Sequence, residues 1–380
     1  MVHVGLNAHL LSAEAGYRAA GIHNVIHRLL QHLPSVASSD WHFTAMVGSR
    51  ITAQYEGIQL RHASLDTESP LRRIVWEQVL QPAQLSDFDL YHAMAFVAPL
   101  VNVKPTVVTV YDLTFMRYPE RLPVSRRLYL RLFTALSCQR ARRITAISHS
   151  TAHDLMRLLN IPASKIDVTP LGYDRDVHYP RSASEIASFK QRMGLPERFW
   201  LFIGTIEPRK NLTMLLDAYA QLPTNERLPL ILGGGKGWGI NEVEAKIQQH
   251  GLQNEVKLAG FIPPEDLSLW YNSAEVFLYP SVFEGFGLPV LEAMACGTPI
   301  ITSNVSSLLE VAQNAGLCLP PHDIEAWVQA LRMATSDDTW RTTARQRGLE
   351  EAQHFNWQDT ARLTLASYQK ALHQSSVRSM

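Results

Sequence analysis

The stretch that decides the fold is YPSVFEGFGLPVLEAMACGTP, residues 279–299. It begins as the end of a strand, and Glu284 then lies in a loop with two glycines, at 285 and 287. Glycine permits a positive φ and lets backbone N–H groups approach a ligand closely. Pro289 suits the first turn of a helix, and Gly297 ends that helix. The stretch therefore predicts a strand, a glycine loop and a short helix.

This short helix presents its N-terminus to the glycine loop, which favours binding of a phosphate group. We expect Glu292 in the first turn of the helix, facing the ligand. Since a carboxylate repels a phosphate, its natural partners are neutral hydroxyls such as those of a ribose. Glu284 would lie further out, near whatever the phosphate carries. A buried amphipathic helix with one surface carboxylate is the other interpretation, but it does not explain the Glu-Gly-Phe-Gly loop.

Length and composition indicate a globular protein of two domains, since the chain has 380 residues, 46% of them hydrophobic. The formal net charge is zero, which argues against a nucleic-acid-binding protein. The three cysteines have no CxxC spacing, so we expect neither disulfides nor a zinc site. We also expect no signal peptide and no membrane span, and therefore a cytoplasmic protein.

In the first half of the chain, short apolar runs alternate with helical patterns, as in a doubly wound α/β domain. At the carboxyl ends of its strands we find His92 and the pair Tyr111–Asp112, each of them a candidate for either a structural or a functional role. Gly21 ends a loop between the first strand and the first helix. The predicted strands are 2–8, 41–47, 89–92, 106–110 and 143–147, and the predicted helices are 22–33, 71–81 and 124–142.

The segment 117–143 is strongly basic, with eight arginines and a single acid, Glu120. Read as a helix from Val124, it interleaves arginines with leucines and aromatic residues, a pattern typical of helices that rest on an anionic membrane surface. The alternative is a solvated helix whose arginines pair with acids elsewhere. The first interpretation predicts a peripheral place on the inner face of a membrane.

The periodicity lapses at residues 171–182, which we interpret as the linker to a second α/β domain. We therefore expect a first domain over 1–172 and a second over 173–355. The helix predicted over 357–372 follows the last β/α unit with no strand after it, so residues 356–380 are expected to cross back to the first domain. The second domain's predicted strands are 199–204, 230–233, 256–259, 276–279 and 299–302, with a helix over 212–222.

Arg209 and Lys210 follow the first strand of this second domain, immediately before a helix. Two cations at that position can hold a diphosphate, the arginine as a bidentate fork and the lysine as a point charge. An ordinary surface pair is the alternative. The run GGGKGWG, residues 233–239, is not a P-loop, because no Ser or Thr follows its lysine. We interpret it as a turn that lets a nucleotide approach, with Phe261 and Ile262 placed to lie against the base.

Together these residues resemble a known family. The runs GTIEPRKNL, LGGGKGW and FEGFGLPVLEAMACGTPII, with AISHSTAHDL and IDVTPLGYD upstream, are similar to the retaining glycosyltransferases of family 4. The resemblance covers nearly the whole chain and is most specific in the Glu-x7-Glu element. It implies the GT-B fold, two Rossmann-like doubly wound parallel-sheet domains facing a central cleft. Within this family, the sequence motifs are most similar to those of the bacterial mannosyltransferases that build O-antigen and other polysaccharides.

The resemblance also implies roles for individual residues. Arg209 and Lys210 would hold the diphosphate and stabilise the departing nucleotide in place of a metal ion. Glu292 would hold the ribose and Glu284 the donor sugar, while Gly21 would let a first-domain loop close over the phosphate. The remaining expected donor contacts are Gly204, Thr205, Ile262, Gly285, Phe286, Gly287 and Leu288.

Retention of the anomeric configuration is expected, through front-face attack of an acceptor hydroxyl whose proton passes to the leaving phosphate oxygen. The donor would be GDP-mannose, slightly favoured over UDP-glucose, with no further cofactor and no metal. The acceptor would be a glycan or a lipid-linked glycan. Loops over 12–20 and 97–104 are expected to select that acceptor.

One residue departs from the family pattern. Many relatives have His-Asp after the fourth strand of the first domain, where this chain has Tyr111 and Asp112. A tyrosine hydroxyl can still donate a hydrogen bond to the sugar. The change is also compatible with a different donor sugar or with a protein that binds nucleotide sugars without turnover. An epimerase or a sugar phosphorylase fits the sequence less well, because first-domain acids and a lysine suited to a pyridoxal cofactor are not evident.

Overall fold

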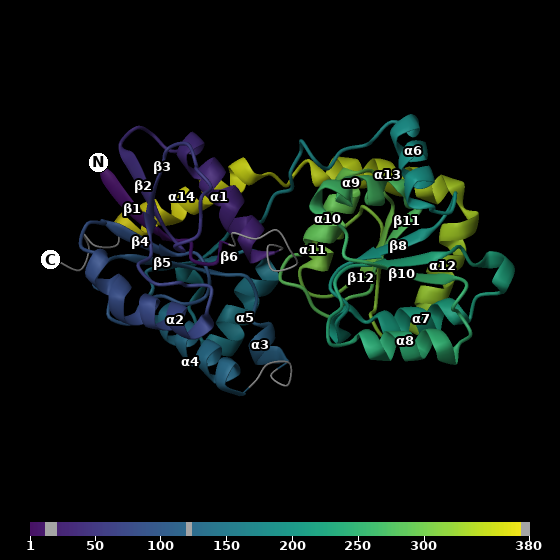
Figure 1. Cartoon of the computed structure of the whole chain (residues 1–380), viewed down its shortest axis with the longest axis horizontal. Coiled ribbons are helices and arrows are strands. Elements are labelled where there is room, and N and C mark those ends of the chain that lie inside the picture. Colours follow the sequence, from purple (N-terminus) through teal and green to yellow (C-terminus); the bar gives the residue numbers. More distant parts are fainter. Residues whose placement is uncertain (12–20, 119–123, 374–380) are drawn as a thin grey trace. The chain divides into compact units, whose positions relative to one another are not determined.

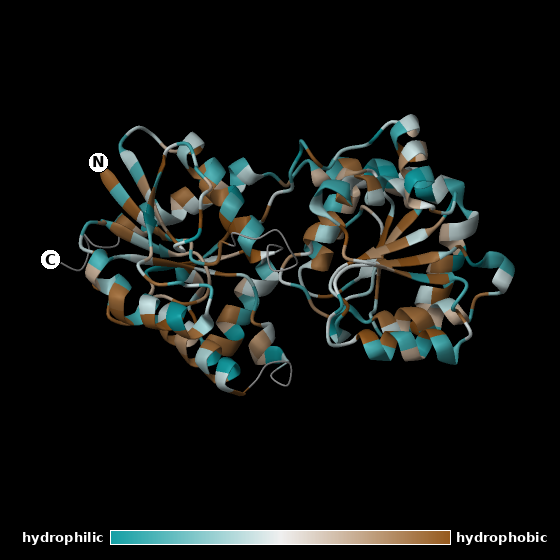
Figure 2. Ribbon diagram, viewed as in Figure 1, coloured by the Kyte–Doolittle hydropathy of each residue, from teal (hydrophilic) through white to brown (hydrophobic). Residues whose placement is uncertain are grey.

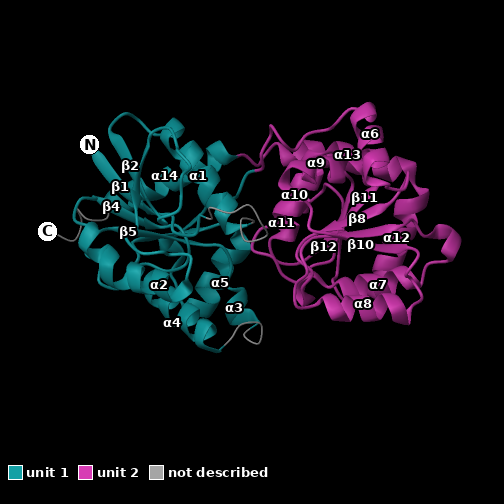
Figure 3. Cartoon of the chain, in the orientation of Figure 1, with its two compact units in different colours: residues 1–172, 357–380 teal, residues 173–356 magenta. Residues whose placement is uncertain are grey.

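The computed structural model describes residues 1–11, 21–118 and 124–373. The chain forms two compact units (Figure 3). Unit 1 comprises Met1–Gly172 together with Trp357–Met380, and unit 2 comprises Tyr173–Asn356. The sequence analysis placed these boundaries after residues 172 and 355. Each unit is a parallel sheet covered by helices, as shown in Figure 1.

Unit 1 contains a seven-stranded parallel sheet in the order β3-β2-β1-β4-β5-β6-β7. Its central strands consist almost wholly of buried residues, because helices cover both faces of the sheet. The strands are β1 (Val2–Asn7), β2 (Trp41–Val47), β3 (Ile58–His62), β4 (Leu90–Ala93), β5 (Thr106–Val110), β6 (Arg143–Ala146) and β7 (Ile166–Val168).

The helices of unit 1 come from both ends of the chain. The C-terminal helix α14 packs on α1 and on the strands β4 to β7. Its Tyr368 hydroxyl lies 2.6 Å from Nδ1 of His92, and Nε2 of His92 lies 2.7 Å from the Thr109 hydroxyl. His92 is thus a buried structural residue, and burial lowers its pKa to about 3. The helices are α1 (Ile22–Val36), α2 (Pro70–Val75), α3 (Thr114–Arg117), α4 (Val124–Arg140), α5 (His149–Leu159) and α14 (Trp357–His373), with η2 (Trp76–Leu80), η3 (Gln81–Gln84) and η5 (Ala163–Lys165).

Unit 2 contains a six-stranded parallel sheet in the order β10-β9-β8-β11-β12-β13. In Figure 2 its strands are coloured mostly as hydrophobic, as expected for a sheet covered on both faces. The ring of Tyr279 stacks on Phe202 of β8 at a centroid separation of 5.7 Å and on Phe277 of its own strand, β11, at 5.6 Å. The strands are β8 (Trp200–Ile203), β9 (Leu230–Gly233), β10 (Val256–Gly260), β11 (Val276–Tyr279), β12 (Ile300–Ser303) and β13 (Leu317–Leu319).

Two groups of helices cover the sheet of unit 2. Helices α9, α10, α11 and α13 form one group, and α7, α8 and α12 form the other (Figure 1). The helices are α6 (Ala183–Met193), α7 (Leu212–Ala220), α8 (Ile240–Gln249), α9 (Pro264–Ser273), α10 (Leu288–Ala295), α11 (Leu308–Ala312), α12 (Ile324–Ser336) and α13 (Asp338–Ala352), with η6 (Pro208–Lys210) and η7 (Thr224–Glu226).

In each sheet, the strand order reverses at one point. This point lies between β1 and β4 in unit 1 and between β8 and β11 in unit 2. Many α/β proteins bind ligands outside the carboxyl ends of the two strands at such a point. Each unit therefore offers one such position for a candidate site.

The predicted doubly wound α/β class is confirmed, but several elements were missed. Strands β3, β7 and β13 were not predicted, because they lie at the sheet edges and their residues are largely half-exposed. The helix predicted around 71–81 is present, but only Pro70–Val75 is α-helical. It continues as the π-helical turn η2 and then as the 3₁₀ turn η3. Pro82 has no N–H and therefore cannot make the α-helical hydrogen bond to the Gln78 carbonyl.

Candidate active site

The candidate site in unit 2 is built from two loops that leave neighbouring strands. The turn η6, which carries Arg209 and Lys210, follows β8, and the loop with Glu284 follows β11. A backbone hydrogen bond of 2.8 Å from the Val282 N–H to the Arg209 carbonyl joins the two loops. The predicted cations and the predicted glutamate therefore meet at the point where the strand order reverses.

Glu284 lies between the two cations. Its Oε1 accepts a hydrogen bond of 2.6 Å from Nζ of Lys210, and its Oε2 accepts one of 2.5 Å from Nη1 of Arg209. Lys210 also donates to the hydroxyl of Tyr279, and its Nζ lies 4.6 Å from the centroid of that ring. Nε of Arg209 donates to Glu207 at 2.5 Å. Two cations and two carboxylates thus form one connected network.

The network shifts the acidities of its buried members. Burial would raise the pKa of Glu284, but Arg209 and Lys210 outweigh it and lower that pKa to about 2. Burial, and then the charge of Arg209, lower the pKa of Lys210 to about 8, although Glu284 opposes this change. At neutral pH both groups are therefore charged, and Lys210 remains a cation by a narrow margin.

The loop after Glu284 leads into the N-terminus of α10. Gly287 has φ +109°, and a Cβ atom there would lie 2.8 Å from Cδ2 of Leu308, so glycine is required for both conformation and space. Leu288 and Pro289 are the first two helical residues. The N–H groups of Val290 and Leu291 donate to the Gly287 carbonyl at 3.0 and 3.2 Å, so Leu288 carries the one N–H of this turn without an intrahelical acceptor. Gly285 and Phe286 are buried between the network and this turn, with the ring of Phe286 against Phe355.

Glu292 is the fifth residue of α10, so the predicted place in the first turn was wrong. Its half-buried carboxylate accepts a hydrogen bond of 3.0 Å from the hydroxyl of Tyr271. Its other oxygen lies 3.8 Å from Nε2 of His178. The hydroxyl of Tyr271 thus orients the carboxylate, and within the described residues no Lys or Arg forms an ion pair with it.

The glycine run after β9 serves to bring two backbone segments together. A Cβ atom on Gly234 would lie 2.0 Å from the carbonyl oxygen of Gly204, and one on Gly237 would lie 2.3 Å from that of Ile206. The glycines of this run thus accommodate the loop 204–208, and the approach of a nucleotide to the run stays a prediction. Gly204 is half-buried and Thr205 is exposed at the end of β8.

Ile262 and Phe261 follow β10. Ile262 is buried, and its Cδ1 atom occupies the position above Gly233 where a Cβ would lie only 2.4 Å away. Phe261 is exposed. A base stacked at this position would thus meet the ring of Phe261, whereas Ile262 supports the strand end.

Comparison with known proteins assigns the chain to a family. Residues 19–177 match the family described as Glycosyltransferase Family 4, and residues 184–354 match the one described as Glycosyl transferases group 1. O-antigen chain mannosyltransferase B of Escherichia coli is 37% identical over 282 residues, which are 73% of this chain and 74% of that protein. The chain belongs to glycosyltransferase family 4.

The family 4 glycosyltransferase has further relatives. A serotype-specific mannosyltransferase of Escherichia coli is 31% identical over 279 residues, which are 71% of this chain but 34% of that protein. Sucrose-phosphate synthase from Thermosynechococcus elongatus superposes with a TM-score of 0.79 at 22% identity, over 98% of this chain and 100% of that one. At this identity the likeness shows the fold alone, and it confirms the expected GT-B class.

In unit 1 of the glycosyltransferase, Tyr111 is buried at the end of β5. Its hydroxyl donates a hydrogen bond of 2.8 Å to the Met94 carbonyl, and burial raises its pKa far above the ordinary value. The half-buried Asp112 accepts a hydrogen bond of 2.8 Å from the Thr114 N–H at the start of α3. A contact of Tyr111 with a donor sugar would require its bond to Met94 to break.

The remaining predicted residue of unit 1 is Gly21, which precedes α1. It has φ +68°, and nothing lies within 4 Å of the position of a Cβ. The conformation rather than crowding therefore favours glycine here. The loop 12–20, expected to help select the acceptor, lies outside the described residues.

Sequence reasoning missed several residues of this glycosyltransferase's site. Glu207 pairs with Arg209, and the side chain of Tyr279 holds Lys210. Ser306 and Ser307 fasten the loop through the Glu284 backbone, at 3.0 and 2.9 Å. Glu207 lies two residues before Arg209 in the run EPRKN, so this motif could have indicated Glu207 as a site residue. The serines lie more than 20 residues from Glu284, and no local pattern could assign them.

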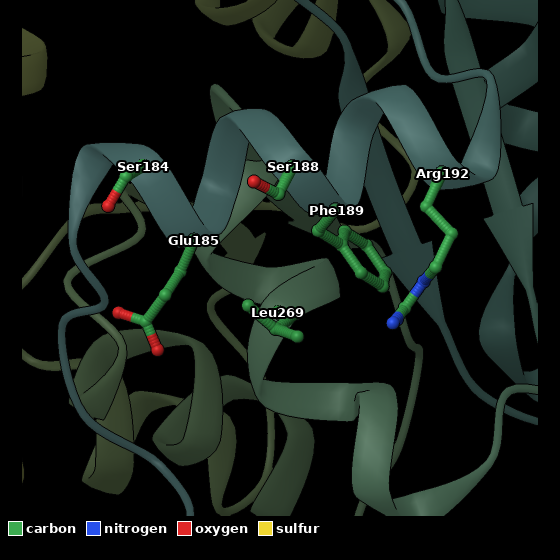
Figure 4. A pocket seen from close by; sticks show the side chains of 6 residues that line it. All are labelled: Ser184, Glu185, Ser188, Phe189, Arg192 and Leu269. Carbon is green, nitrogen blue, oxygen red and sulfur yellow. The ribbon is translucent and has the colours of Figure 1, made fainter.

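Unit 2 also has a hollow that lies away from this network. It lies between α6 and α9 and is lined by Ser184, Glu185, Ser188, Phe189, Arg192 and Leu269 (Figure 4). No predicted site residue of the glycosyltransferase lines it. Among residues 1–11, 21–118 and 124–373, no three His, Cys, Asp or Glu side chains gather as metal ligands would.

Proposed function

We propose that the protein transfers a hexose, with mannose favoured, from a nucleoside diphosphate sugar to a hydroxyl of a glycan or lipid-linked glycan. The observation that carries this proposal is the cation pair Arg209–Lys210 beside the N-terminus of α10, outside the carboxyl ends of β8 and β11. Helix N-termini and buried cations favour a diphosphate. The mannosyltransferase names of the relatives favour mannose as the transferred sugar.

The proposed reaction retains the anomeric configuration. The bond between the anomeric carbon and the diphosphate oxygen breaks, and the acceptor oxygen forms the new bond on the same face. The acceptor's proton passes to the leaving phosphate oxygen, so the protein needs no separate base. Arg209 and Lys210 stabilise the negative charge that develops on the diphosphate, a role that needs no metal ion.

The two carboxylates of the network reduce the free energy that is gained when a diphosphate binds. Glu207 and Glu284 already balance the charges of Arg209 and Lys210, so a diphosphate must compete with them for the same donors. Once the diphosphate takes these donors, the Glu284 carboxylate becomes available to a hydroxyl of the donor sugar. Glu292 is oriented by Tyr271 and is proposed to hold the ribose.

The test measures binding of GDP, UDP, GDP-mannose and UDP-glucose by calorimetry, in the wild type and in Lys210→Ala. We expect Lys210→Ala to weaken diphosphate binding by roughly 1.5–3 kcal/mol, the value of a hydrogen bond to a charged group. Lys257→Ala, which removes an exposed lysine of the edge strand β10, should leave affinity unchanged. Equal affinity in all three proteins would refute the proposed diphosphate site.

Transfer itself is followed with radiolabelled sugar on mannosylated acceptors. A higher rate of transfer from UDP-glucose than from GDP-mannose would identify UDP-glucose, the alternative donor, as the substrate. Nucleotide binding without transfer to any acceptor would favour a non-catalytic partner in a glycan assembly complex.

We also propose that unit 1 rests on an anionic membrane surface. Val124, Leu128 and Leu132 lie four residues apart in α4 and are 67%, 63% and 50% exposed. They form an apolar stripe directed away from the core. Arg126 and Arg131 beside them are exposed and have no carboxylate partner within the described residues. For these two arginines this disfavours pairing with acids elsewhere, whereas Arg117 and Arg143 of the same basic segment pair with Asp154 and Asp167. Residues 119–123 of the segment lie outside the described residues.

Neighbouring segments extend this apolar and basic surface. Leu71, Val75 and Val79 repeat the same four-residue spacing along α2 and η2 and are all exposed. Gln78 of η2 exchanges hydrogen bonds with the loop after Val97, and Arg140 of α4 donates to the Leu100 carbonyl of that loop at 2.9 Å. Apolar stripes flanked by unpaired arginines fit the interface of an anionic bilayer. None of the described helices is long and apolar enough to cross one.

Sedimentation with phosphatidylglycerol vesicles tests this surface. We expect binding at low salt and release at high salt, because screening weakens the attraction. Replacing Arg126 and Arg131 by Gln should lower partitioning roughly 30-fold, at about 1 kcal/mol for each cation. Leu128→Ser should also weaken it, whereas Leu363→Ser, on the exposed side of α14, should not. Binding that survives all of these changes would refute the assignment.

A further inference from the structure

The loop that carries Glu284 is held by the segment that follows the neighbouring strand, β12. Residues 280–287 connect β11 to α10 without regular secondary structure, so bonds other than those of a sheet or a helix hold their backbone. The Glu284 N–H donates to Oγ of Ser306 at 3.0 Å, and the hydroxyl of Ser307 donates to the Glu284 carbonyl at 2.9 Å. Both polar backbone groups of this glutamate are thus bonded to the side chains of two consecutive serines.

The same segment also contacts the loop close to both of its ends. The hydroxyl of Thr302 in β12 donates to the Tyr279 carbonyl at 2.9 Å, immediately before the loop. At the far end, Cδ2 of Leu308 lies only 2.8 Å from where a Cβ on Gly287 would be. Leu308 begins α11, which packs beside α10 (Figure 1). The segment after β12 therefore supports the loop at both ends as well as at its centre.

Ser306 makes its hydrogen bond from a strained backbone. Its φ is +50°, in the left-handed region that costs free energy for a residue other than glycine. Glycine would relieve this strain but has no hydroxyl, whereas the serine brings Oγ to the Glu284 N–H. Strained residues persist only where their surroundings hold them, and they cluster at functional sites. The position therefore favours a hydrogen-bond acceptor over a relaxed backbone.

The backbone position of Glu284 matters for the proposed reaction. Its carboxylate oxygens accept hydrogen bonds from Lys210 and Arg209, the donors that a diphosphate takes in that reaction. Once a diphosphate has taken these donors, they no longer orient the carboxylate. Its place beside the donor sugar is then set by the backbone bonds of Glu284. Misplacement of such a group by about 1 Å can cost about 100-fold in rate.

We propose that Ser306 is a positioning residue for the transfer reaction. Its hydroxyl holds the backbone of Glu284 so that the carboxylate meets the donor sugar once the two cations have bound the diphosphate. Ser306 acts through Glu284 and contributes no group to the bond that forms or to the bond that breaks. This role rests on the proposed function, because it presupposes a nucleoside diphosphate sugar in the site.

Three variants of Ser306 test whether the rate follows the hydrogen-bond acceptor. Ser306→Ala removes the acceptor and should lower kcat for transfer from GDP-mannose, or from UDP-glucose if the wild type prefers it, about 10–100-fold. Ser306→Gly also lacks the acceptor but relieves the strain, so its rate should fall as much and poor folding would not explain the loss. Ser306→Asn tolerates a positive φ and carries an acceptor oxygen, so it should recover part of the rate.

Nucleotide affinity and a matched control separate positioning from general support of the fold. Calorimetric affinity for GDP and UDP should not weaken in any of the three variants, because Arg209 and Lys210 keep their places. Ser182→Ala is the control. It removes another serine hydroxyl of unit 2 that accepts from a backbone N–H, that of Glu185 at 3.3 Å. Its melting temperature should fall, while kcat stays at the wild-type value.

The outcomes distinguish this inference from the proposed function. Wild-type kcat in Ser306→Ala and Ser306→Gly would overturn the inference and leave the proposed function standing. A loss of nucleotide affinity as large as the loss of rate would also overturn it, since the serine would then support the whole site rather than Glu284. A wild type that transfers no sugar would refute the proposed function, and this inference with it.

Discussion

The replacement Glu284→Gln probes the charge network most directly. Glutamine has nearly the same shape, so it leaves no cavity but removes the negative charge between Arg209 and Lys210. Lys210 is only 5% exposed, so little water reaches it in compensation. Loss of one partner from a buried ion pair costs about 3–5 kcal/mol. Deprotonating Lys210 instead, from its ordinary pKa of 10.5, costs about 5 kcal/mol at pH 7, at 1.36 kcal/mol per pH unit.

Calorimetric unfolding should therefore show a fall in the melting temperature of unit 2 of roughly 6–20 °C, at 2–4 °C per kcal/mol. The loss of stability in Glu284→Gln relative to the wild type, here called the deficit, should also depend on pH. Without Glu284 the folded-state pKa of Lys210 falls below its present value of about 8. Between that lower pKa and pH 8, the variant binds one more proton when it is unfolded than when it is folded. The free energy of unfolding of the variant therefore rises with pH over this range, whereas that of the wild type does not.

The deficit of Glu284→Gln should thus shrink by up to about 1.4 kcal/mol for each pH unit on the way from pH 6 to pH 8. Glu350→Gln, which neutralises an exposed glutamate of α13, serves as the control and should be close to the wild type at both pH values. A melting temperature within 2 °C of the wild type, or a deficit of equal size at pH 6 and pH 8, would refute the reasoning about Lys210.

Three further changes have expected outcomes. The affinity for a nucleoside diphosphate, measured by calorimetry, should fall above pH 8 by up to about tenfold per pH unit, because Lys210 loses its proton. An affinity that stays constant up to pH 9.5 would exclude Lys210 from the diphosphate site. Gly287→Ala should lower the melting temperature more than Gly194→Ala, because both residues have a positive φ but only the first would meet a neighbour within 3 Å; equal losses would contradict this. Tyr111→Phe should destabilise unit 1 by about 1–3 kcal/mol, since it leaves a buried carbonyl unpaired, without changing nucleotide affinity; weaker nucleotide binding would instead support a direct donor contact.

The sequence predicted the central strands to within one or two residues, since they are continuous apolar runs. The short helix α10 was also predicted, because Gly287, Pro289 and Gly297 mark its ends. Of the edge strands, β10 was predicted, whereas β3, β7 and β13 were not, since they are largely half-exposed and their pairing depends on a neighbour distant in the chain. Local patterns therefore predict the strands that are buried on both faces, but predict the edge strands only in part.

At the candidate site the sequence indicated the residue types but not their partners. Arg209, Lys210 and Glu284 were predicted from two separate motifs, and only the fold brings them into one network. The hydrogen bond from Tyr271 to Glu292 joins α9 to α10, and no spacing in the sequence predicts it. The role of Tyr111 depends on a carbonyl 17 residues away, and that distance in sequence concealed its structural bond.

The place of α14 has a consequence for how the protein is made. Residues 357–373 cover the sheet of unit 1, and Lys370 donates to Asp167 at 2.6 Å while Arg142 donates to the Ala371 carbonyl at 3.0 Å. On the ribosome, unit 2 is therefore complete before unit 1, although most of unit 1 is synthesised first. Domains generally fold as units during synthesis, N-terminal ones first. Here the part of the unit 1 sheet that α14 covers stays exposed until residues 357–373 have left the exit tunnel, and during that interval this apolar surface is open to chaperone binding.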